Sequence, residues 1–311
     1  MTKDAPIGVL LMAYGTPGSI EEIEPYYTDI RRGRPPSPEL LAELVERYRL
    51  VGGKTPLLEI SQSQAFGLQE TLGEAYRVFL GMKHWHPYIR QAVAEMRLAG
   101  IEKAVGVVLA PHFSRGSIGE YRQLVENARQ QLDYDLDITV VPSWHLNRYY
   151  LKAVEEHARR ALEQFEDPST VTVIFTAHSL PVRVVADGDP YEAQLLETSR
   201  ALAERLGLAD DDWTFSFQSA GRTPDPWLGP DLVETVERLS SSGVTNILVV
   251  PVGFIADHLE IFYDIDHEAK DAARERGVRL ERTESLNHDP ELIAALKDVV
   301  LAAGQVTEAG T

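Results

Sequence analysis

The sequence predicts an α/β protein made of two similar, doubly wound parallel-sheet domains. Short apolar, β-branched runs alternate with longer helical patterns, which is typical of parallel sheets covered by helices on both faces. One strand-ending pattern occurs twice, as AYGTP at 13–17 and as AHSLP at 177–181. The length of 311 residues fits two domains or one large one. A duplicated α/β unit accounts for all three observations.

Five runs have the length and composition of buried strands. They are nearly continuous in apolar residues, so each is expected to be covered on both faces of its sheet. The runs cover residues 7–14, 104–111, 137–144, 171–178 and 246–254. Strands of this kind belong to a parallel sheet that lies between two layers of helices.

Helical patterns fill much of the chain between these strands. They cover residues 38–50, 88–100, 150–165, 191–207 and 230–243. Gly100, Gly207 and Gly243 each stand where the left-handed residue after a helix is expected. The alternation of strand and helix therefore continues through both halves of the chain.

The repeat also predicts the domain boundaries. The first half is longer between its landmarks, and the extra length fits the RRGRPP and GGKTPLLEISQSQ segments. We expect an N-terminal domain over 1–148 with a ligand-binding insertion at about 28–65, and a C-terminal domain over 149–311 with a final helix at about 289–304. Ligands of open α/β sheets bind beyond the carboxyl ends of the strands, so a cleft between the two sheets is the expected site.

Composition excludes several classes of protein. The formal net charge of −18 argues against nucleic acid as a partner, and RRGRPP is the only dense basic segment. The absence of cysteine excludes disulfides, thiolate zinc sites and cysteine-ligated iron–sulfur clusters. No apolar run is long enough to span a membrane, and the N-terminus is typical of a first strand and not of a signal peptide. A cytoplasmic location is expected.

His178 and Tyr14 occupy the same place in the two halves, directly after an apolar strand. A histidine there is often purely structural, but at the carboxyl end of a strand it can also bind a metal or accept a proton near neutral pH. Ser-Leu-Pro follows His178 and predicts a turn. A flat ligand in the cleft would then meet one of these residues on each face.

A row of acids follows the strand at 246–254. Glu260, Asp264 and Glu268 are spaced four residues apart, which places them on one face of an α-helix. Ile265 marks the side that faces the core, so the acids are expected to lie off it. Such rows are mostly solvated, but a row that leads away from a metal site can also conduct cations.

Taken together, these residues resemble the ferrochelatase family, whose members insert ferrous iron into a porphyrin. The resemblance runs from about residue 7 to 304. It is carried by the segments VLLMAYGTP, YYTDIRRGRPP, ERYRLVGG, GMKHWHP, VLAPHFS, AHSLP, DPWLGP and VPVGFIADHLEIFYDID. Many matches in one order are far more specific than any single motif.

The resemblance implies a role for each candidate residue. His178 and Glu260 would form the catalytic metal-insertion site on one face of the porphyrin, with Asp264 and Glu268 as the acidic metal path behind them. Tyr14 would be the axial ligand to the product iron on the other face. Related enzymes that use protoporphyrin commonly have methionine at that position, so Tyr14 is similar to the coproporphyrin III ferrochelatases of Gram-positive-type bacteria.

The residues expected to contact the macrocycle or its propionates are Arg31, Arg47, Tyr48, Thr55 and Tyr121. Thr55 differs slightly from the family pattern, in which serine supplies the hydroxyl. Coproporphyrin carries several propionates, so an acidic protein needs its RRGRPP segment near the cleft, and we expect Arg31 to pair with one propionate.

The resemblance thus predicts insertion of ferrous iron into coproporphyrin III to give coproheme in haem biosynthesis. Ferrous iron would be a substrate, with no prosthetic group, and the enzyme would be a monomer that transiently contacts the downstream coproheme decarboxylase. Four alternatives stay open. They are a protoporphyrin IX ferrochelatase, a non-catalytic haem or tetrapyrrole carrier, a chelatase that inserts cobalt or nickel into another tetrapyrrole, and a two-lobed small-molecule binding protein.

Overall fold

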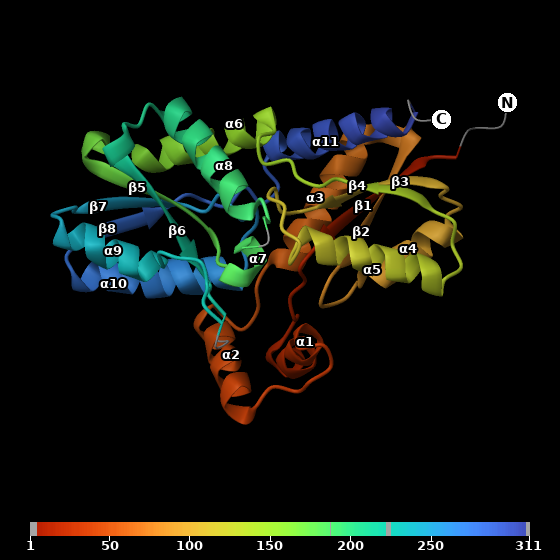
Figure 1. Ribbon diagram of the computed structural model, residues 1–311, viewed down its shortest axis with the longest axis horizontal. Coiled ribbons are helices and arrows are strands. Elements are labelled where there is room, and N and C mark those ends of the chain that lie inside the picture. Colours follow the sequence, from red (N-terminus) through yellow and green to blue (C-terminus); the bar gives the residue numbers. More distant parts are fainter. Residues whose placement is uncertain (1–4, 187, 222–224, 309–311) are drawn as a thin grey trace. The chain divides into compact units, whose positions relative to one another are not determined.

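The chain folds into two compact units, each built around one parallel sheet. The computed structural model describes residues 5–186, 188–221 and 225–308. The first unit comprises Met1–Ala110, Ser117–Trp144 and Asn287–Thr311, and the second comprises Pro111–Gly116 and His145–Leu286 (Figure 1). The α/β class predicted from the sequence is confirmed.

The sheet of the first unit has the strand order β2-β1-β3-β4, and all neighbouring strands are parallel. Its strands are β1 (Ile7–Ala13), β2 (Tyr76–Met82), β3 (Lys103–Val108) and β4 (Asp137–Val140). Val9 to Met12 of the central strand β1 are fully buried, as the continuous apolar run predicts. Strand β2 has no counterpart among the predicted strands, because Arg77 and Gly81 interrupt its apolar run.

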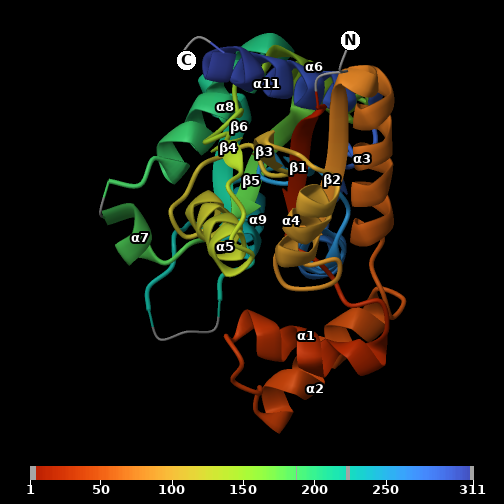
Figure 2. The same cartoon turned by 90° about the vertical axis from the view of Figure 1, so that its right-hand side faces the viewer.

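The first unit also contains helices, most of which cover the faces of this sheet. They are α1 (Ile23–Ile30), α2 (Pro38–Leu50), α3 (Leu57–Leu72), α4 (Ile89–Leu98), α5 (Ile118–Gln131) and α11 (Pro290–Glu308), with short 3-10 turns at Ile20–Glu22 and Gly73–Ala75. Helices α4 and α5 lie on one face, and α3 and α11 lie on the other (Figure 1). Helices α1 and α2 pack on each other beyond the carboxyl end of β1 (Figure 2).

The C-terminal helix differs from the expected division of the chain. The sequence pattern assigns a helix at about 289–304 to the C-terminal domain, but α11 packs on α3 and β3 of the first unit. The apolar face of α11, which includes Leu292 and Leu296, is buried. Residues of the predicted insertion at about 28–65 form the end of α1, the loop after it, α2 and the first half of α3.

The sheet of the second unit has the strand order β6-β5-β7-β8, again fully parallel. Its strands are β5 (Val171–His178), β6 (Trp213–Gln218), β7 (Asn246–Val250) and β8 (Arg279–Arg282). The order matches that of the first sheet strand for strand, with β1 in the place of β5. Tyr14 directly follows β1 and His178 ends β5, so the repeat read from the sequence corresponds to equivalent strand ends.

The helices of the second unit also form two layers. They are α6 (Arg148–Leu162), α7 (Val182–Ala186), α8 (Tyr191–Leu206), α9 (Leu232–Ser241) and α10 (Lys270–Glu275), with 3-10 turns at Pro168–Thr170 and Asp210–Asp212 and a π-helix at Ile261–Ala269. Helices α6 and α8 cover one face, and α9 and α10 cover the other (Figure 1). Within the described residues, no helix is both long and apolar enough to cross a membrane.

Candidate active site

His178 lies at the carboxyl end of β5, and its ring is held in one orientation by its own loop. Nδ1 donates a hydrogen bond to the carbonyl of Ser179, because a carbonyl can only accept. Nε2 therefore points away from the backbone and lies 3.4 Å from Oε1 of Glu260. The hydroxyl of Tyr191 donates to the His178 carbonyl at 3.0 Å, which fixes the end of the strand.

The loop after β7 passes close to this strand end. A β-carbon on Gly253 would lie 2.5 Å from Cβ and 2.9 Å from Cα of Ala177, so only glycine fits there. The loop leads through Phe254 and His258 to Glu260. Close approach at Gly253 is thus what brings the segment with Glu260 next to His178.

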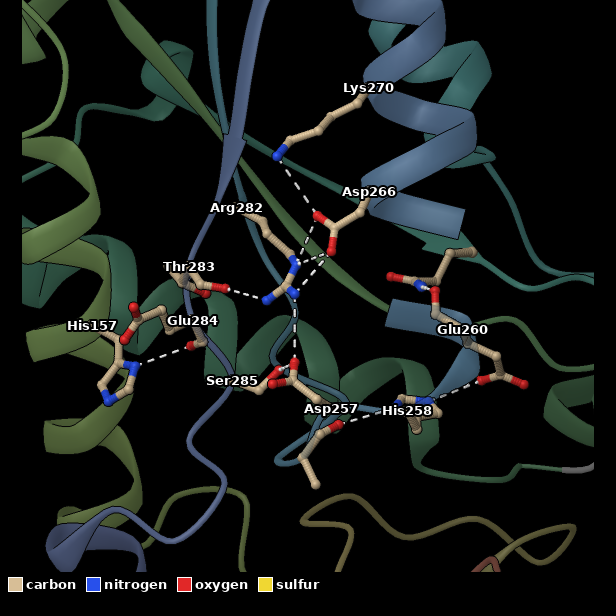
Figure 3. Close-up of polar contacts among 12 residues, drawn as sticks. His157, Asp257, His258, Glu260, Asp266, Lys270, Arg282, Thr283, Glu284 and Ser285 are labelled. Atoms are coloured by element: carbon tan, nitrogen blue, oxygen red, sulfur yellow. Dashed lines mark hydrogen bonds and ion pairs between the residues drawn. The ribbon is translucent and has the colours of Figure 1, made fainter. Parts of the chain in front are cut away.

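The Glu260 carboxylate lies between two imidazoles. Nε2 of His258 is 3.4 Å from Oε2 of Glu260, on the oxygen that does not face His178 (Figure 3). Nδ1 of His258 donates to the Ala256 carbonyl at 2.9 Å, so the His258 ring is oriented in the same way as His178. The side chains of His178 and Glu260 are each about a third exposed, at 32% and 33%. This leaves room for a ligand to reach them.

The charges and hydrogen bonds around His178 and Glu260 together affect the pKa of each residue more strongly than burial does. Burial acts to lower the pKa of His178, but the Glu260 carboxylate and, more weakly, Asp264 raise it to about 9. Burial likewise acts to raise the pKa of Glu260, but the two imidazoles hold it well below its usual range. Near neutral pH the pair is therefore an imidazolium and a carboxylate.

The backbone around Glu260 is supported from strand β6. Nε2 of Gln218 donates to the Glu260 carbonyl at 3.3 Å, and Oε1 of Gln218 accepts from the Thr176 hydroxyl at 2.9 Å. The next residue, Ser219, donates to the Asp264 carboxylate. These contacts link the strand that carries His178, the neighbouring strand and the acidic segment into one hydrogen-bonded group.

The acidic row does not lie entirely off the core, so that expectation is wrong for Asp264. Asp264 is buried at 6% exposure, whereas Glu268 is exposed. The reason is that Ile261–Ala269 is a π-helix, in which each turn holds more residues than in an α-helix. The wider turn places Asp264 on the inner side together with Ile265.

In the first unit, Tyr14 and Tyr121 come together around a lysine. Nζ of Lys83 lies 5.7 Å from the ring centre of Tyr14 and 5.3 Å from that of Tyr121. Lys83 also pairs with Glu120 at 2.6 Å, and the Tyr14 ring meets His84 edge-on at 4.7 Å. Tyr14 is 44% exposed, whereas Tyr121 is buried, and burial raises the pKa of the Tyr121 phenol.

Tyr48 and Thr55 form a second group in this unit. The hydroxyl of Thr16 lies 2.8 Å from that of Thr55 and 3.3 Å from that of Tyr48, and all three side chains are buried.

The two arginines of the predicted site lie on the segment formed by α1 and α2. Arg31 directly follows α1, is exposed and lies over the Tyr27 ring at 5.8 Å. Arg47 of α2 pairs with Glu43 at 3.2 Å.

Comparison with known proteins identifies the family. The ferrochelatase family model matches residues 6–303. The chain belongs to the ferrochelatase family. The ferrochelatase of Herpetosiphon aurantiacus is 45% identical over 302 residues, which cover 95% of this chain and 98% of that protein. The coproporphyrin III ferrochelatase of Halalkalibacterium halodurans is 42% identical over 306 residues, which cover 96% of this chain and 97% of that protein.

A solved structure supports the fold independently. The sirohydrochlorin chelatase SirB from Bacillus subtilis subspecies spizizenii, crystallised with cobalt, has a TM-score of 0.60 to this chain, with 98% of this chain and 97% of that chain covered. At 11% identity this likeness concerns the fold alone. The family resemblance read from the sequence is confirmed, and the protein is a metal chelatase of the lyase class.

Three residues that surround His178 and Glu260 have no place in the sequence prediction. Gln218 and Ser219 were not found because β6 has too few consecutive apolar residues to stand out as a strand. His258 lies two residues before Glu260, in the segment ADHLE. Its closeness in sequence to a candidate metal-binding carboxylate could have indicated that it belongs to the same group. Nowhere in the described part of the chain do three or more His, Asp or Glu side chains form a closed metal-binding cluster.

Proposed function

We propose that this ferrochelatase inserts ferrous iron into coproporphyrin III to give coproheme, and that His178 and Glu260 carry out the insertion. The observation that supports the residue assignment most strongly is the Glu260 carboxylate between His178 and His258. The substrate assignment is supported by Tyr14 and by relatives at 42% identity that are named coproporphyrin III ferrochelatases.

Metallation requires that the porphyrin lose two pyrrole protons and that iron shed part of its water shell. In the free enzyme, Glu260 stabilises a proton on His178. A ferrous ion that approaches Glu260 competes with this proton, because both cations are attracted to the same carboxylate. Entry of iron therefore releases the His178 proton to solvent, which reaches the partly exposed side chain. The freed imidazole then becomes available as a metal ligand or as a base for a pyrrole N–H.

The acidic path stays a proposal that fits the exposure of its members. Glu268 is exposed, Asp264 is buried, and Glu260 lies at the site. A divalent cation attracted by Glu268 would meet the Asp264 carboxylate next. Asp264 is held by Ser219 and is close enough to His178 to raise the pKa of that imidazole.

The first unit would bind the porphyrin. Tyr14 is 44% exposed, so its hydroxyl is accessible enough to coordinate an iron. Arg31 is exposed and suited to a propionate. Tyr48 and Thr55 are buried and would shape the binding surface through Thr16 rather than by wide contact with the ligand.

Other expectations from the sequence stay predictions. These are the lack of a prosthetic group, the cytoplasmic location, the monomeric state and the transient contact with a coproheme decarboxylase. Membership in an enzyme family favours catalysis over a carrier role. Protoporphyrin IX is the alternative substrate, since relatives at 45% identity are named simply ferrochelatase.

The substrate is tested by anaerobic iron insertion, followed by absorbance, with coproporphyrin III and protoporphyrin IX in parallel. A larger kcat/KM for coproporphyrin III is expected. A larger value for protoporphyrin IX would contradict the substrate assignment and leave the chelatase. Tight binding of both porphyrins without insertion would contradict the enzyme itself.

A further inference from the structure

The π-helix at the site needs support from outside itself. It is nine residues long and begins directly after Glu260. π-Helices occur mostly as single-turn bulges, so a helix of this length is an unusual conformation that neighbouring groups must hold. The segment that carries Asp264 is therefore the part of the site most dependent on contacts with the rest of its unit.

One arginine outside the helix makes several hydrogen bonds to it. Arg282 ends β8, the edge strand whose carboxyl end lies on the same side of the sheet as that of β5. Its Nε lies 3.0 and 3.1 Å from the two carboxylate oxygens of Asp266, and its Nη2 lies 2.9 Å from Oδ2 of Asp266 (Figure 3). Asp266 is in the middle of the π-helix.

The same guanidinium reaches the chain before Glu260. Nη2 of Arg282 lies 3.5 Å from Oδ1 of Asp257, and Asp257 also accepts a hydrogen bond from the Ser285 hydroxyl at 2.7 Å (Figure 3). Nη1 of Arg282 donates to the Thr283 carbonyl at 3.0 Å. The side chain is only 13% exposed, so the charge of Arg282 is largely removed from water and depends on these partners.

The two carboxylates lie on either side of Glu260 in the sequence. By binding both, Arg282 closes the segment between Asp257 and Asp266 into a loop anchored on β8. Lys270 lies 3.7 Å from Asp266, is 38% exposed and also faces Glu281, so it can replace little of this contact. Without the arginine, Asp257 and Asp266 would lose the cation that they share. The helix would keep its buried apolar side chains and the contact with Ser219 but would lose its ion pair with β8.

We propose that Arg282 is a positioning residue for metal insertion, which holds the π-helix in the register that directs Glu260 toward His178 and Asp264 toward Ser219. This inference rests on the proposed function of Glu260. Relaxation of the segment toward an α-helix would change each hydrogen bond from i+5 to i+4 spacing and rotate the acids relative to one another. Arg282 touches neither iron nor porphyrin in this role and acts only through Asp257 and Asp266.

The geometry explains why arginine stands at this position. A guanidinium presents several N–H groups in one plane and can serve a bidentate carboxylate, a second carboxylate and a carbonyl at once. An ammonium group is a single point charge, so lysine could hold Asp266 or Asp257 but not both in the same geometry. Arg282→Lys should therefore recover part of the function that Arg282→Gln loses.

The test combines iron kinetics with hydrogen exchange in four variants. Arg282→Gln and Arg282→Lys are compared with Asp266→Asn and with Arg279→Gln, a matched control on the same strand whose side chain is 42% exposed and pairs with Glu281. Anaerobic insertion is measured over separate ranges of ferrous iron and porphyrin. Amide exchange is followed in peptides that cover 257–268.

We expect Arg282→Gln to lower kcat/KM for ferrous iron by about tenfold or more, as loss of residues that orient metal ligands commonly does. The KM for porphyrin should stay within about twofold, since Arg282 does not face the porphyrin. Exchange over 257–268 should accelerate in Arg282→Gln and not in Arg279→Gln. Arg282→Lys should lie between wild type and Arg282→Gln, and Asp266→Asn should change both readouts in the same direction.

The inference would be overturned if Arg282→Gln and Arg279→Gln had the same iron kinetics and the same amide exchange. It would also be overturned if Arg282→Gln lowered kcat/KM for ferrous iron and for porphyrin by the same factor. If Arg282→Gln does not fold, Asp266→Asn decides by the same criteria, because it keeps the contact between Arg282 and Asp257. Absence of iron insertion by the wild-type protein would instead overturn the proposed function. The exchange result alone would then decide whether Arg282 holds the helix.

Discussion

Replacing Glu260 by glutamine removes the charge that faces His178 but keeps a side chain of nearly the same size. In the wild-type protein the carboxylate overcomes burial and raises the pKa of His178 to about 9. Without it, burial is opposed only by the hydrogen bond to the Ser179 carbonyl and, more weakly, by the charge of Asp264. We therefore expect the pKa of His178 to fall to its ordinary value of about 6.5 or below.

The change is large enough to measure directly. At pH 7.5, an imidazole with a pKa of 9 is about 97% protonated, and one with a pKa of 6.5 is about 10% protonated. NMR of imidazole-labelled protein, titrated from pH 5 to pH 10, reports this fraction for His178, and His178→Ala assigns its signal. A pKa that stays near 9 in Glu260→Gln would refute the pairing on which the mechanism depends.

The same pair predicts a pH-dependent stability. His178 has a higher pKa in the folded protein than in the unfolded chain, so its contribution is complete below about pH 6.5 and is lost as the pH rises through 9. Glu260 has a lowered pKa, so its contribution is present above about pH 4.3 and is lost on acidification. The difference in unfolding free energy between wild type and Glu260→Gln should therefore be largest between about pH 5 and 6.5 and disappear above pH 9.

Three further substitutions test the other parts of the account. Arg31→Ala should weaken coproporphyrin III binding by about three- to tenfold, since an exposed charge-assisted pair is lost; unchanged affinity in fluorescence quenching would exclude the pairing with a propionate. Tyr14→Phe should leave iron insertion active but change the visible spectrum of the ferric product complex, and an identical spectrum would exclude Tyr14 as its ligand. Gly253→Ala should destabilise the fold by about 1–3 kcal/mol, because its methyl group would overlap Ala177; an unchanged urea midpoint would show that the loop moves freely.

Local patterns were sufficient for the central strands, but not for the pair formed by His178 and Glu260. Strands β1, β3, β5 and β7 are continuous apolar runs, so burial on both faces is visible in the sequence itself. The repeat of AYGTP and AHSLP indicated two equivalent strand ends, and the two sheets have the same strand order. The pairing of His178 with Glu260 was implied by the family resemblance.

The remaining features depend on contacts that the sequence does not display. Strands β2, β6 and β8 lie beside strands that are more apolar. Polar residues interrupt their own apolar runs, so the sequence pattern does not indicate them as strands. The position of α11 is decided by packing on α3, far away in the chain. The π-helix is not visible in the spacing of its acids, and Arg282, which contacts Asp266 within it, lies on strand β8.

The most direct test of the central claim, that His178 in the second unit is needed for metallation, is anaerobic iron insertion by His178→Ala together with its porphyrin binding. We predict that turnover falls by about a hundredfold or more, the contribution of a positioned acid–base group, while the dissociation constant for coproporphyrin III changes by less than about twofold. Turnover close to that of wild type, in a variant that binds porphyrin normally, would contradict the assignment of metal insertion to this imidazole.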